Sequence, residues 1–368
     1  MHVEDRWMKT GPNGRKIRTS RYGSGKRWRA VWTEPDGTRR RKSCTTRDEA
    51  EAALADIRVA QLTGSYIAPN RSKTTVAEVA EDWVAAQIHQ RRTSQDAIRI
   101  RLDRTILPTL GDQRIDQVTR ATIQAAIREW STTLAPSTVA VAYKYTAAIF
   151  RHAVDDKRIP TSPCTRINLP AVVHEAVVPL TVDQVQALTE AMWKPYQRLA
   201  AFIAATGVRG GEARGLTWDR VKARGDGAAV TIDRQLLTSE PAWGPPKTPT
   251  SVRTIAVGPR TVATLGPRGQ GLVFTTAGGR PISRKNMSEA WRRAARIVGI
   301  EGRTGFHDLR DFHASQLIAG GASPVAVARR LGHKDPTETL RTYAHLWHDD
   351  EERMVAATDG VVRLPAPS

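Results

Sequence analysis

Residues 305–346 read GFHDLRDFHASQLIAGGASPVAVARRLGHKDPTETLRTYAHL. The stretch places His307 and Arg310 three residues apart, then a Leu-Gly-His ending at His333, and then Tyr343. Side chains three residues apart share a helix face, so His307 and Arg310 can reach one site. Arginine offers a rigid fork of donors to phosphate oxygens, imidazole can donate or move a proton near neutral pH, and a tyrosine oxygen can act as a covalent nucleophile. These residue types together suit chemistry on a phosphodiester.

Each of these residues also has an ordinary structural interpretation. Tyr343 stands with Leu340 and Leu346 at helical spacing, as a core residue would. His333 follows a glycine, as residues at helix ends often do. Several histidines fall within residues 307–348, but no cysteine is near and no His-Glu-x-x-His spacing occurs, so no metal site is expected. No P-loop occurs either, and no cofactor is expected.

The order and spacing of the motifs change the balance between these interpretations. They resemble those of the tyrosine recombinases, in particular the lambda-type phage integrases. That family has a His-x-x-Arg box, here from His307 to Arg310, then a Leu-Gly-His, here ending at His333, and then a tyrosine, here Tyr343.

Two upstream segments extend the resemblance. The family has an arginine in a Thr-Gly-x-Arg-x-x-Glu segment, which residues 206–212 match with Arg209 and Glu212. It also has a lysine in a β-hairpin before a basic strand, and residues 245–257, PPKTPTSVRTIAV, offer Lys247. Glu212 could orient the catalytic cluster or could simply be a charge at a helix start. A lone hairpin lysine is usually a surface residue, so the assignment of Lys247 depends on its place in the motif order.

Two departures from the family pattern are visible. Asp311-Phe312 stand where the family often has His-Thr, and Gly210-Gly211 replace bulkier or polar residues. Neither touches an expected catalytic position, so they indicate altered local packing rather than altered activity.

The resemblance implies a mechanism. The implied catalytic residues are Arg209, Lys247, His307, Arg310, His333 and Tyr343, with Glu212 in support. Tyr343 would attack a DNA phosphorus, form a 3′-phosphotyrosyl link and release a 5′-hydroxyl. The two arginines and His333 would hold the phosphate, and Lys247 would protonate the leaving oxygen. His307 would assist deprotonation of Tyr343 or bind the phosphate. Because a free phenol has a pKa near ~10, a cation cluster beside it is expected.

Composition indicates a nucleic-acid partner. The 368 residues include 56 Lys and Arg against 37 Asp and Glu, a net charge of +19, and are 40% hydrophobic. Such a surplus usually marks a surface that binds a polyanion. There is no long apolar run and no apolar N-terminal segment, so neither membrane association nor a signal peptide is expected. Cys44 and Cys164 are far apart, which fits a reducing bacterial cytoplasm.

Residues 1–66 are predicted to form a small separate module. The alternating segment RWRAVWT at residues 27–33 predicts a strand, residues 34–37 a turn, and Thr46 with Glu49 a capping box for a helix. The expected fold is a three-stranded sheet with one helix behind it. It resembles the arm-type DNA-binding domains of phage integrases. The DNA contacts expected there are Arg27, Arg29, Arg39, Arg40 and Arg41.

The rest of the chain is expected to form two further domains and a tail. After a polar linker, residues 75–165 read as a helical domain that resembles the core-binding domain of the family. One helix should run from Ser94 to Ile106 and end where Leu107-Pro108 and then Gly111-Asp112 break the chain. A proline-rich connector over residues 160–180 would be the hinge.

Residues 177–358 should form the catalytic domain, followed by a tail at 359–368. A helix should end at Gly207, and strands are expected at 228–236 and 251–257, with a hairpin at 272–282. A basic helix over residues 284–298 would offer Arg292 and Arg293 to the duplex.

The predicted fold class is therefore α+β, mainly α, with small antiparallel sheets. The predicted function is site-specific recombination, by a phage or mobile-element integrase that integrates and excises DNA. Alternatives are a transposon or chromosome-resolution recombinase, a type IB topoisomerase, or a non-catalytic DNA-binding protein. The expected partners are double-stranded attachment sites, a homotetramer on DNA, and possible host DNA-bending and excision factors.

Overall fold

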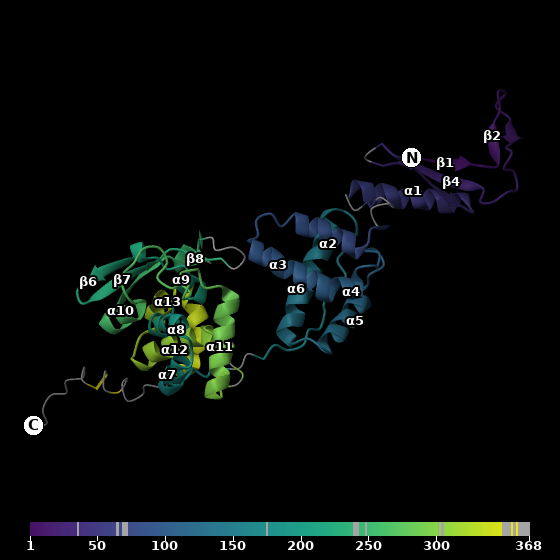
Figure 1. Ribbon diagram of the computed structural model, residues 1–368. Coiled ribbons are helices and arrows are strands. Elements are labelled where there is room, and N and C mark those ends of the chain that lie inside the picture. Colours follow the sequence, from purple (N-terminus) through teal and green to yellow (C-terminus); the bar gives the residue numbers. More distant parts are fainter. Residues whose placement is uncertain are drawn as a thin grey trace, which may run out of the picture. The chain divides into compact units, whose positions relative to one another are not determined.

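The computed structural model describes the chain except for residues 35–36, 64–65, 68–72, 174–175, 238–242, 247–248, 301, 303–304, 348–354, 356–357 and 360–368. The chain forms two compact units, Met1–Val173 and His174–Ser368 (Figure 1). Among the helices that the structure describes, none has the length and apolar character that a bilayer crossing requires.

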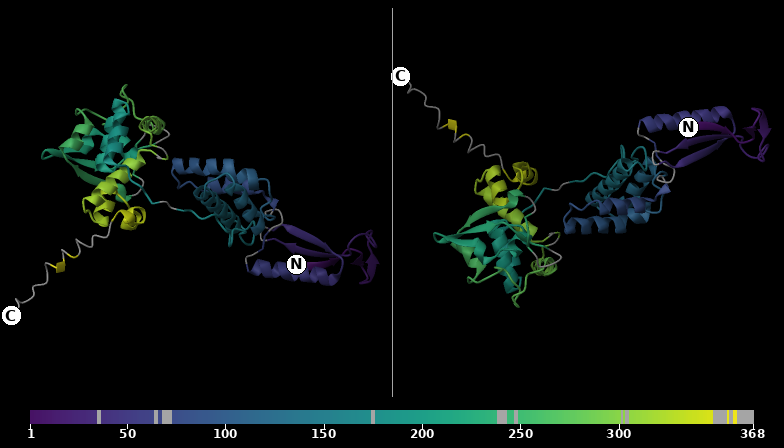
Figure 2. Two further views of the ribbon diagram at one scale, coloured as in Figure 1. Left: turned by 90° about the horizontal axis from the view of Figure 1, so that it is seen from below. Right: turned by 90° about the horizontal axis from the view of Figure 1, so that it is seen from above.

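The first unit begins with a sheet backed by a helix. The elements are β1 (His2–Asp5), β2 (Met8–Thr10), β3 (Lys16–Arg18), β4 (Trp28–Thr33), β5 (Arg39–Cys44) and α1 (Arg47–Leu62). β4 pairs antiparallel with β1 and β5, and α1 runs along this sheet (Figure 2). Thr46 and Glu49 form the predicted capping box. The predicted three-stranded sheet with one helix is confirmed, while half of the turn predicted at residues 34–37 lies outside the described residues.

A bundle of helices follows in the same unit. They are α2 (Val76–Ala85), α3 (Arg92–Arg101), the π-helix η2 (Leu102–Ile106), α4 (Leu107–Leu110), α5 (Arg120–Ser131) and α6 (Pro136–Asp155). Apolar side chains at helical spacing meet in one core, in which Val79, Ile123 and Phe150 are completely buried. The predicted helical character of this segment is confirmed.

The predicted break at Pro108 is wrong. The helical path continues through it to Leu110, and the chain turns only at Gly111. At the π-turn η2 the Leu107 N–H bonds back to the Leu102 carbonyl, one residue further than in an α-helix. Pro108 then stands in the first turn of α4, where the missing N–H of proline costs little.

The second unit combines helices with small sheets. Its first half has α7 (Val182–Glu190), α8 (Lys194–Thr206), α9 (Gly210–Arg214), η3 (Trp218–Arg220), β6 (Val221–Arg224), β7 (Gly227–Ile232), β8 (Gln235–Leu236) and β9 (Trp243–Gly244). Its second half has η4 (Pro249–Ser251), β10 (Arg253–Val257), α10 (Pro259–Leu265), α11 (Arg284–Val298), α12 (His307–Ala319), α13 (Pro324–Leu331), α14 (Pro336–Tyr343) and η5 (Ala344–Leu346). One sheet has the order β10-β7-β6, and β8 pairs with β9.

The sheets differ in detail from the sequence prediction. The strand expected at 228–236 is divided into β7 and β8, which belong to different sheets. The hairpin expected at 272–282 has only the isolated bridge between Thr275 and Pro281 within the described residues. Turn residues there were identified correctly, but too few backbone pairs form to make a ladder.

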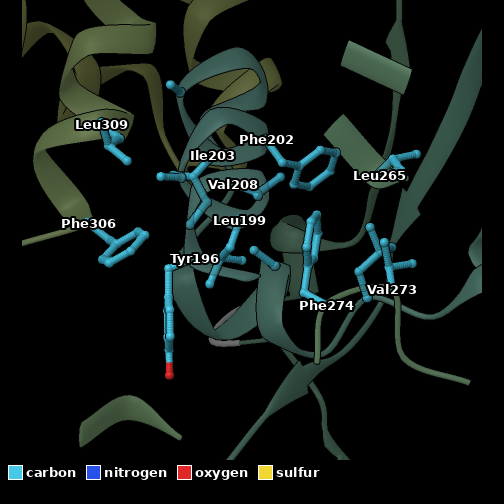
Figure 3. Packing of buried hydrophobic residues seen from close by; sticks show 14 of the residues in the cluster. Tyr196, Leu199, Phe202, Ile203, Val208, Leu265, Val273, Phe274, Phe306 and Leu309 are labelled. Carbon is cyan, nitrogen blue, oxygen red and sulfur yellow. The ribbon is translucent and has the colours of Figure 1, made fainter. Parts of the chain in front are cut away.

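The core of this unit surrounds α8 (Figure 3). Phe202 of α8 lies 5.3 Å from the Phe274 ring, measured between centroids, and Leu199 and Ile203 are also completely buried. Gly207 ends α8 in the predicted left-handed conformation, with φ of 67°. A Cβ at Gly207 would lie 2.5 Å from a ring carbon of His313, so only glycine permits this approach of α8 to α12. The tight turn brings the start of α9 against the start of α12.

Candidate active site

Arg310 lies at the centre of the site. It projects from α12, is 2% exposed, and donates through Nη1 to the Gly207 carbonyl at 2.6 Å. Its Nη2 is buried and has no hydrogen-bond partner among the residues that the structure describes. Burial lowers the pKa of Arg310 to about 10, and the charge of Arg209 adds to the shift, so the group is still a cation at neutral pH. A buried cation with an unused donor suits an anionic ligand.

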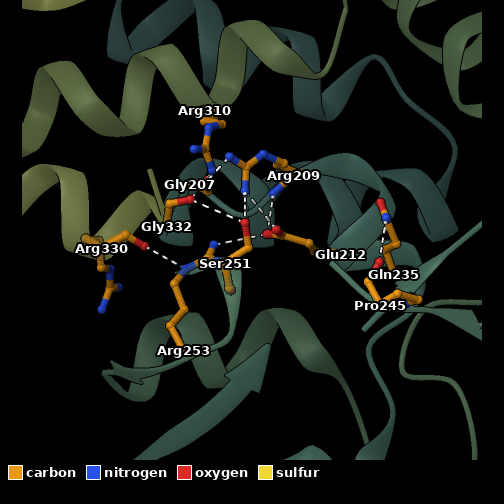
Figure 4. A network of polar contacts seen from close by, with 10 residues as sticks. All are labelled: Gly207, Arg209, Glu212, Gln235, Pro245, Ser251, Arg253, Arg310, Arg330 and Gly332. Carbon is orange, nitrogen blue, oxygen red and sulfur yellow. Dashed lines mark hydrogen bonds and ion pairs between the residues drawn. The ribbon is translucent and has the colours of Figure 1, made fainter. Parts of the chain in front are cut away.

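Glu212 holds two further arginines beside Arg310 (Figure 4). Its carboxylate, 2% exposed, accepts from Arg209 Nη1 at 3.1 Å and from Arg253 Nη2 at 3.0 Å. The Arg209 backbone N–H also donates to it at 3.0 Å, as in a capping box at the start of α9. Burial alone would raise the pKa of Glu212, but the Arg253 ion pair and the Arg209 bonds outweigh burial and lower it.

Ser251 and Gly332 connect this cluster to distant parts of the chain. Arg209 Nη1 donates to Ser251 Oγ at 3.2 Å, and its Nη2 donates to the Gly332 carbonyl at 3.3 Å. Arg253 Nε donates to the Arg330 carbonyl at 2.9 Å (Figure 4). Sequence reasoning missed Ser251 and Arg253, and the only available signal was the basic strand that follows the expected lysine.

A cavity of about 260 Å³ lies against the Arg209 and Arg310 side chains. His307, whose side chain is 67% exposed, lines the same cavity at the start of α12. Gly210 forms part of the wall, and a Cβ there would lie 2.6 Å from the Met287 methyl carbon. The glycine at this departure from the family pattern therefore allows α9 to pack closely against α11.

His333 adds an imidazole to the cation cluster. Gly332 ends α13 with φ of 71°, and the next residue, His333, places Nδ1 at 2.7 Å from Thr339 Oγ1. Burial lowers the pKa of His333 to about 3, and the charges of Arg310 and Arg209 add to the shift. The ring is therefore neutral at physiological pH, with one N–H to donate.

Tyr343 is buried at the end of α14. It is 2% exposed and packs with Ala314 and Leu331. Its hydroxyl donates to Asp311 Oδ1 at 2.5 Å. Burial first, and then the negative charge of Asp311, raise the pKa of Tyr343 far above its ordinary value. Tyr343 is thus both a core residue and a neighbour of the cation cluster. Asp311 carried no catalytic prediction, and its departure from the family pattern was the only signal.

The remaining predicted catalytic residue, Lys247, lies outside the described residues, so its role stays a prediction. Two other histidines of the motif region bond to backbone carbonyls: His313 Nδ1 donates to Ala204 at 3.1 Å, and His345 Nε2 donates to Val177 at 2.8 Å. Across the described part of the chain, no three His, Cys, Asp or Glu side chains are grouped so that they could hold a metal ion.

Most arginines expected to contact DNA from the N-terminal module are paired with carboxylates. The pairs are Arg27–Asp5 at 2.9 Å, Arg29–Glu4 at 3.5 Å and Arg40–Glu34 at 3.0 Å. Arg39 and Arg41 are exposed on β5. Since alternate residues face opposite sides of a sheet, and Cys44 packs against α1, these two arginines lie on the face away from the helix.

The basic helix α11 divides its arginines between two faces. Arg293 stacks on Trp193, with 5.2 Å between the guanidinium carbon and the ring centroid. Arg292 donates to the Ser288 carbonyl at 3.4 Å, and Ser288 lines the cavity together with Arg284. Because Arg284, Ser288 and Arg292 are spaced by four residues, they form one face, and Arg293 lies off it.

Known proteins are similar to this chain in sequence. Residues 179–349 match the model of the phage integrase family, and residues 76–169 match that of the phage integrase central domain. A protein named as the prophage phiRv2 integrase of Mycobacterium tuberculosis is 27% identical over 351 residues, covering 89% of this chain and 91% of that protein. The integrase of Salmonella phage P22 is 23% identical over 89% of this chain and 91% of its own length.

Solved structures show the same fold. The Tn1549 transposon integrase in complex with circular-intermediate DNA superposes with a TM-score of 0.67 at 18% identity, over 78% of this chain and 100% of that chain. A lambda integrase tetramer bound to a Holliday junction gives a TM-score of 0.60 at 15% identity, over 90% and 96%.

The chain belongs to the tyrosine recombinase family, as its motifs predicted. It is a site-specific recombinase, an enzyme that cleaves and rejoins DNA strands.

Proposed function

We propose that this recombinase is the integrase of a phage or a related mobile element and that it works through a covalent bond between DNA and Tyr343. The observation that carries the proposal is the meeting of Arg209, Arg310 and His307 at one cavity. His307 Nε2 lies 3.9 Å from the Asp311 carboxylate, which accepts the Tyr343 hydroxyl and so links the nucleophile to this cluster. The unused buried donor of Arg310 suits a phosphate oxygen.

The proposed reaction conserves the phosphodiester bond energy. Tyr343 Oη attacks phosphorus, a 3′-phosphotyrosyl bond forms, and the 5′-oxygen leaves with a proton from Lys247. Arg209 and Arg310 bind the non-bridging oxygens as charge develops, where one pre-oriented donor is worth roughly 3–4 kcal/mol. His307 binds the phosphate or assists deprotonation. His333, neutral because of its lowered pKa of about 3, donates a hydrogen bond rather than acting as an acid.

Glu212 has a supporting role in this scheme. It neutralises part of the charge of Arg209 and Arg253 and fixes the direction in which the Arg209 fork points. Without it, the positive charges of Arg209 and Arg253 would repel each other next to Arg310. We therefore assign Glu212 to positioning rather than to chemistry.

We also propose three DNA-contacting domains: an arm-type domain at residues 1–66, a core-binding domain at 75–165 and a catalytic domain at 177–358, followed by a tail at 359–368. The net charge of +19 supports extensive phosphate contact. In the arm-type domain, Arg39 and Arg41 are the better candidates, because Arg27, Arg29 and Arg40 already have carboxylate partners.

The proposed partners are double-stranded attachment sites and three further copies of the chain. Two paired strand exchanges require four nucleophiles, and the similar lambda integrase was solved as a tetramer on a Holliday junction. A host DNA-bending protein and an excision factor complete the proposal. Transposon integration is the second candidate function, supported by the Tn1549 likeness.

A covalent-adduct assay tests the proposed chemistry. Supercoiled plasmids carrying candidate host integration sequences are incubated with the protein without metal or ATP, quenched with detergent, and separated on a gel. The wild type should give a DNA-linked protein band that Tyr343→Phe abolishes. Tyr196→Phe is the matched control, because Tyr196 is another mostly buried tyrosine of the same unit, outside the site. An adduct that survives in Tyr343→Phe would refute the assignment.

A further inference from the structure

Asp311 is the residue in closest polar contact with the proposed nucleophile. Its Oδ1 accepts the Tyr343 hydroxyl at 2.5 Å and lies 3.9 Å from His307 Nε2. The residue is 9% exposed and directly follows Arg310 in α12. Within the described residues, no other group bonds to the Tyr343 hydroxyl.

The proton of Tyr343 presents a chemical problem. Burial and the nearby carboxylate raise the pKa of Tyr343, so a free phenolate does not accumulate at neutral pH. The proton must therefore leave while the new oxygen–phosphorus bond forms. A group that accepts it must already be within hydrogen-bond distance.

The two histidines of the site are poorly suited to accept this proton. His333 Nδ1 is bonded to Thr339, and its pKa of about 3 makes the ring a weak base. His307 has a 67% exposed side chain, and its Nε2 approaches Asp311 rather than Tyr343. This leaves Asp311 as the acceptor that the geometry provides.

We propose that Asp311 is a further catalytic residue, which accepts the proton of the Tyr343 hydroxyl during DNA cleavage. The Tyr343 Oη–P bond forms while the P–O5′ bond breaks, and the phenolic proton moves to Asp311 Oδ1. The leaving 5′-oxygen takes a separate proton from the leaving side, where Lys247 is proposed. Rejoining reverses these transfers, so Asp311 returns the proton to Tyr343. Kinases use an aspartate in the same way for an attacking hydroxyl.

This inference rests on the proposed role of Tyr343. It is tested with the full-length protein and the plasmid on which the wild type forms an adduct, by measuring single-turnover rates of cleavage and rejoining. Asp311→Asn should slow both rates by about a hundredfold or more, the usual contribution of a positioned base. DNA binding, measured by fluorescence anisotropy, should not change.

Glu338→Gln is the matched control. Glu338 is an exposed carboxylate on α14 whose charge also raises the pKa of Tyr343, but it does not bond to the hydroxyl. Its substitution should leave both rates near those of the wild type. A loss equal to that of Asp311→Asn would overturn the proposal, because a general charge effect would then be sufficient.

A fluorinated tyrosine at position 343 separates proton transfer from a structural role. Fluorine lowers the phenol pKa and so reduces the need for a base. It should therefore restore much of the cleavage rate in Asp311→Asn, and a slow variant without this rescue would show that Asp311 only shapes the site.

An Asp311→Asn protein that cleaves as fast as the wild type, or faster, would show that Asp311 merely restrains Tyr343. Failure of the proposed function itself would be seen separately, as an adduct that survives in Tyr343→Phe.

Discussion

Arginine is used in opposite ways in the catalytic cluster and in the N-terminal module. Arg310 is 2% exposed and keeps an unused donor, although burial lowers its pKa to about 10. Arg27 in the module is more exposed, and its carboxylate partner Asp5 is 2.9 Å away. The buried Arg310 lowers the stability of the folded protein but can bind an anion. The exposed ion pair of Arg27 and Asp5 is already formed and contributes little to folding stability. Motif matching alone would treat both as DNA contacts.

The difference shows that charge count is a poor guide to which cations act. Glu212 neutralises part of the catalytic cluster, but in the part of the chain that the structure describes Arg310 has no carboxylate partner of its own. In the module, Asp5, Glu4 and Glu34 pair with Arg27, Arg29 and Arg40, and the ion pairs weaken the attraction of these arginines for a further anion.

Replacing Arg310 by methionine should reduce adduct formation by about 10²–10³-fold, the effect of losing one oxyanion donor. The free protein should become more stable, because an apolar side chain of similar length replaces a buried, incompletely bonded cation. Single-turnover cleavage and thermal unfolding measure the two effects. Arg27→Met is the control and should change both only slightly. An Arg310→Met protein less stable than the wild type would show that the buried Arg310 does not lower folding stability.

Replacing Glu212 by glutamine should lower the free energy of unfolding by about 3 kcal/mol, because Arg209 and Arg253 lose the buried carboxylate that balances their charge. The pKa of Glu212 is lowered in the folded state, so its stabilisation is present above the unfolded pKa and is lost as pH falls through the folded pKa. Urea unfolding at neutral and acidic pH measures both. Glu51→Gln removes an exposed pair with Arg47 and should cost far less.

His333 should make stability depend on pH. Its pKa is about 3 in the folded protein against 6.5 unfolded, so the unfolded chain binds the proton first and stability falls as pH drops below 6.5. One pKa unit corresponds to about 1.4 kcal/mol, so we expect a loss of about 2 kcal/mol in the free energy of unfolding between pH 7 and 5. His333→Gln should flatten this slope in urea titrations, and the exposed His89→Gln should not. His313, with a pKa of about 4, accounts for the slope that remains.

The smallest effect concerns two neighbouring arginines of β5. Arg41→Ala should reduce the slope of log affinity against log salt concentration by about 1, the effect of one lost phosphate contact. Arg40→Ala should change it less, because Arg40 is paired with Glu34. Binding to plasmid fragments at several salt concentrations measures both. Equal slopes for the two variants would show that the carboxylate pairing does not decide which arginine binds DNA.

Local sequence features predicted much of the fold. The capping box at Thr46 forms as expected, because it needs only contacts three residues apart. The left-handed glycine at 207 was also predictable from its position after an apolar helix. Pro108 was misread as a break, because the π-turn before it is a tertiary adjustment of the helix that has no signal in the sequence.

The sequence by itself determined the reaction class. The motifs that carry it are each short, and their order along the chain can be read directly from the sequence; they contain Arg209, His307, Arg310, His333 and Tyr343. Only the tertiary structure decided how these residues are supported. The bond from Arg209 to Gly332 spans 123 residues, and that from Tyr343 to Asp311 spans 32. Hydrophobic periodicity describes one helix or strand at a time, so it cannot predict contacts over such separations. These contacts arise only when helices from distant segments pack on one core and bring their polar groups out of water together.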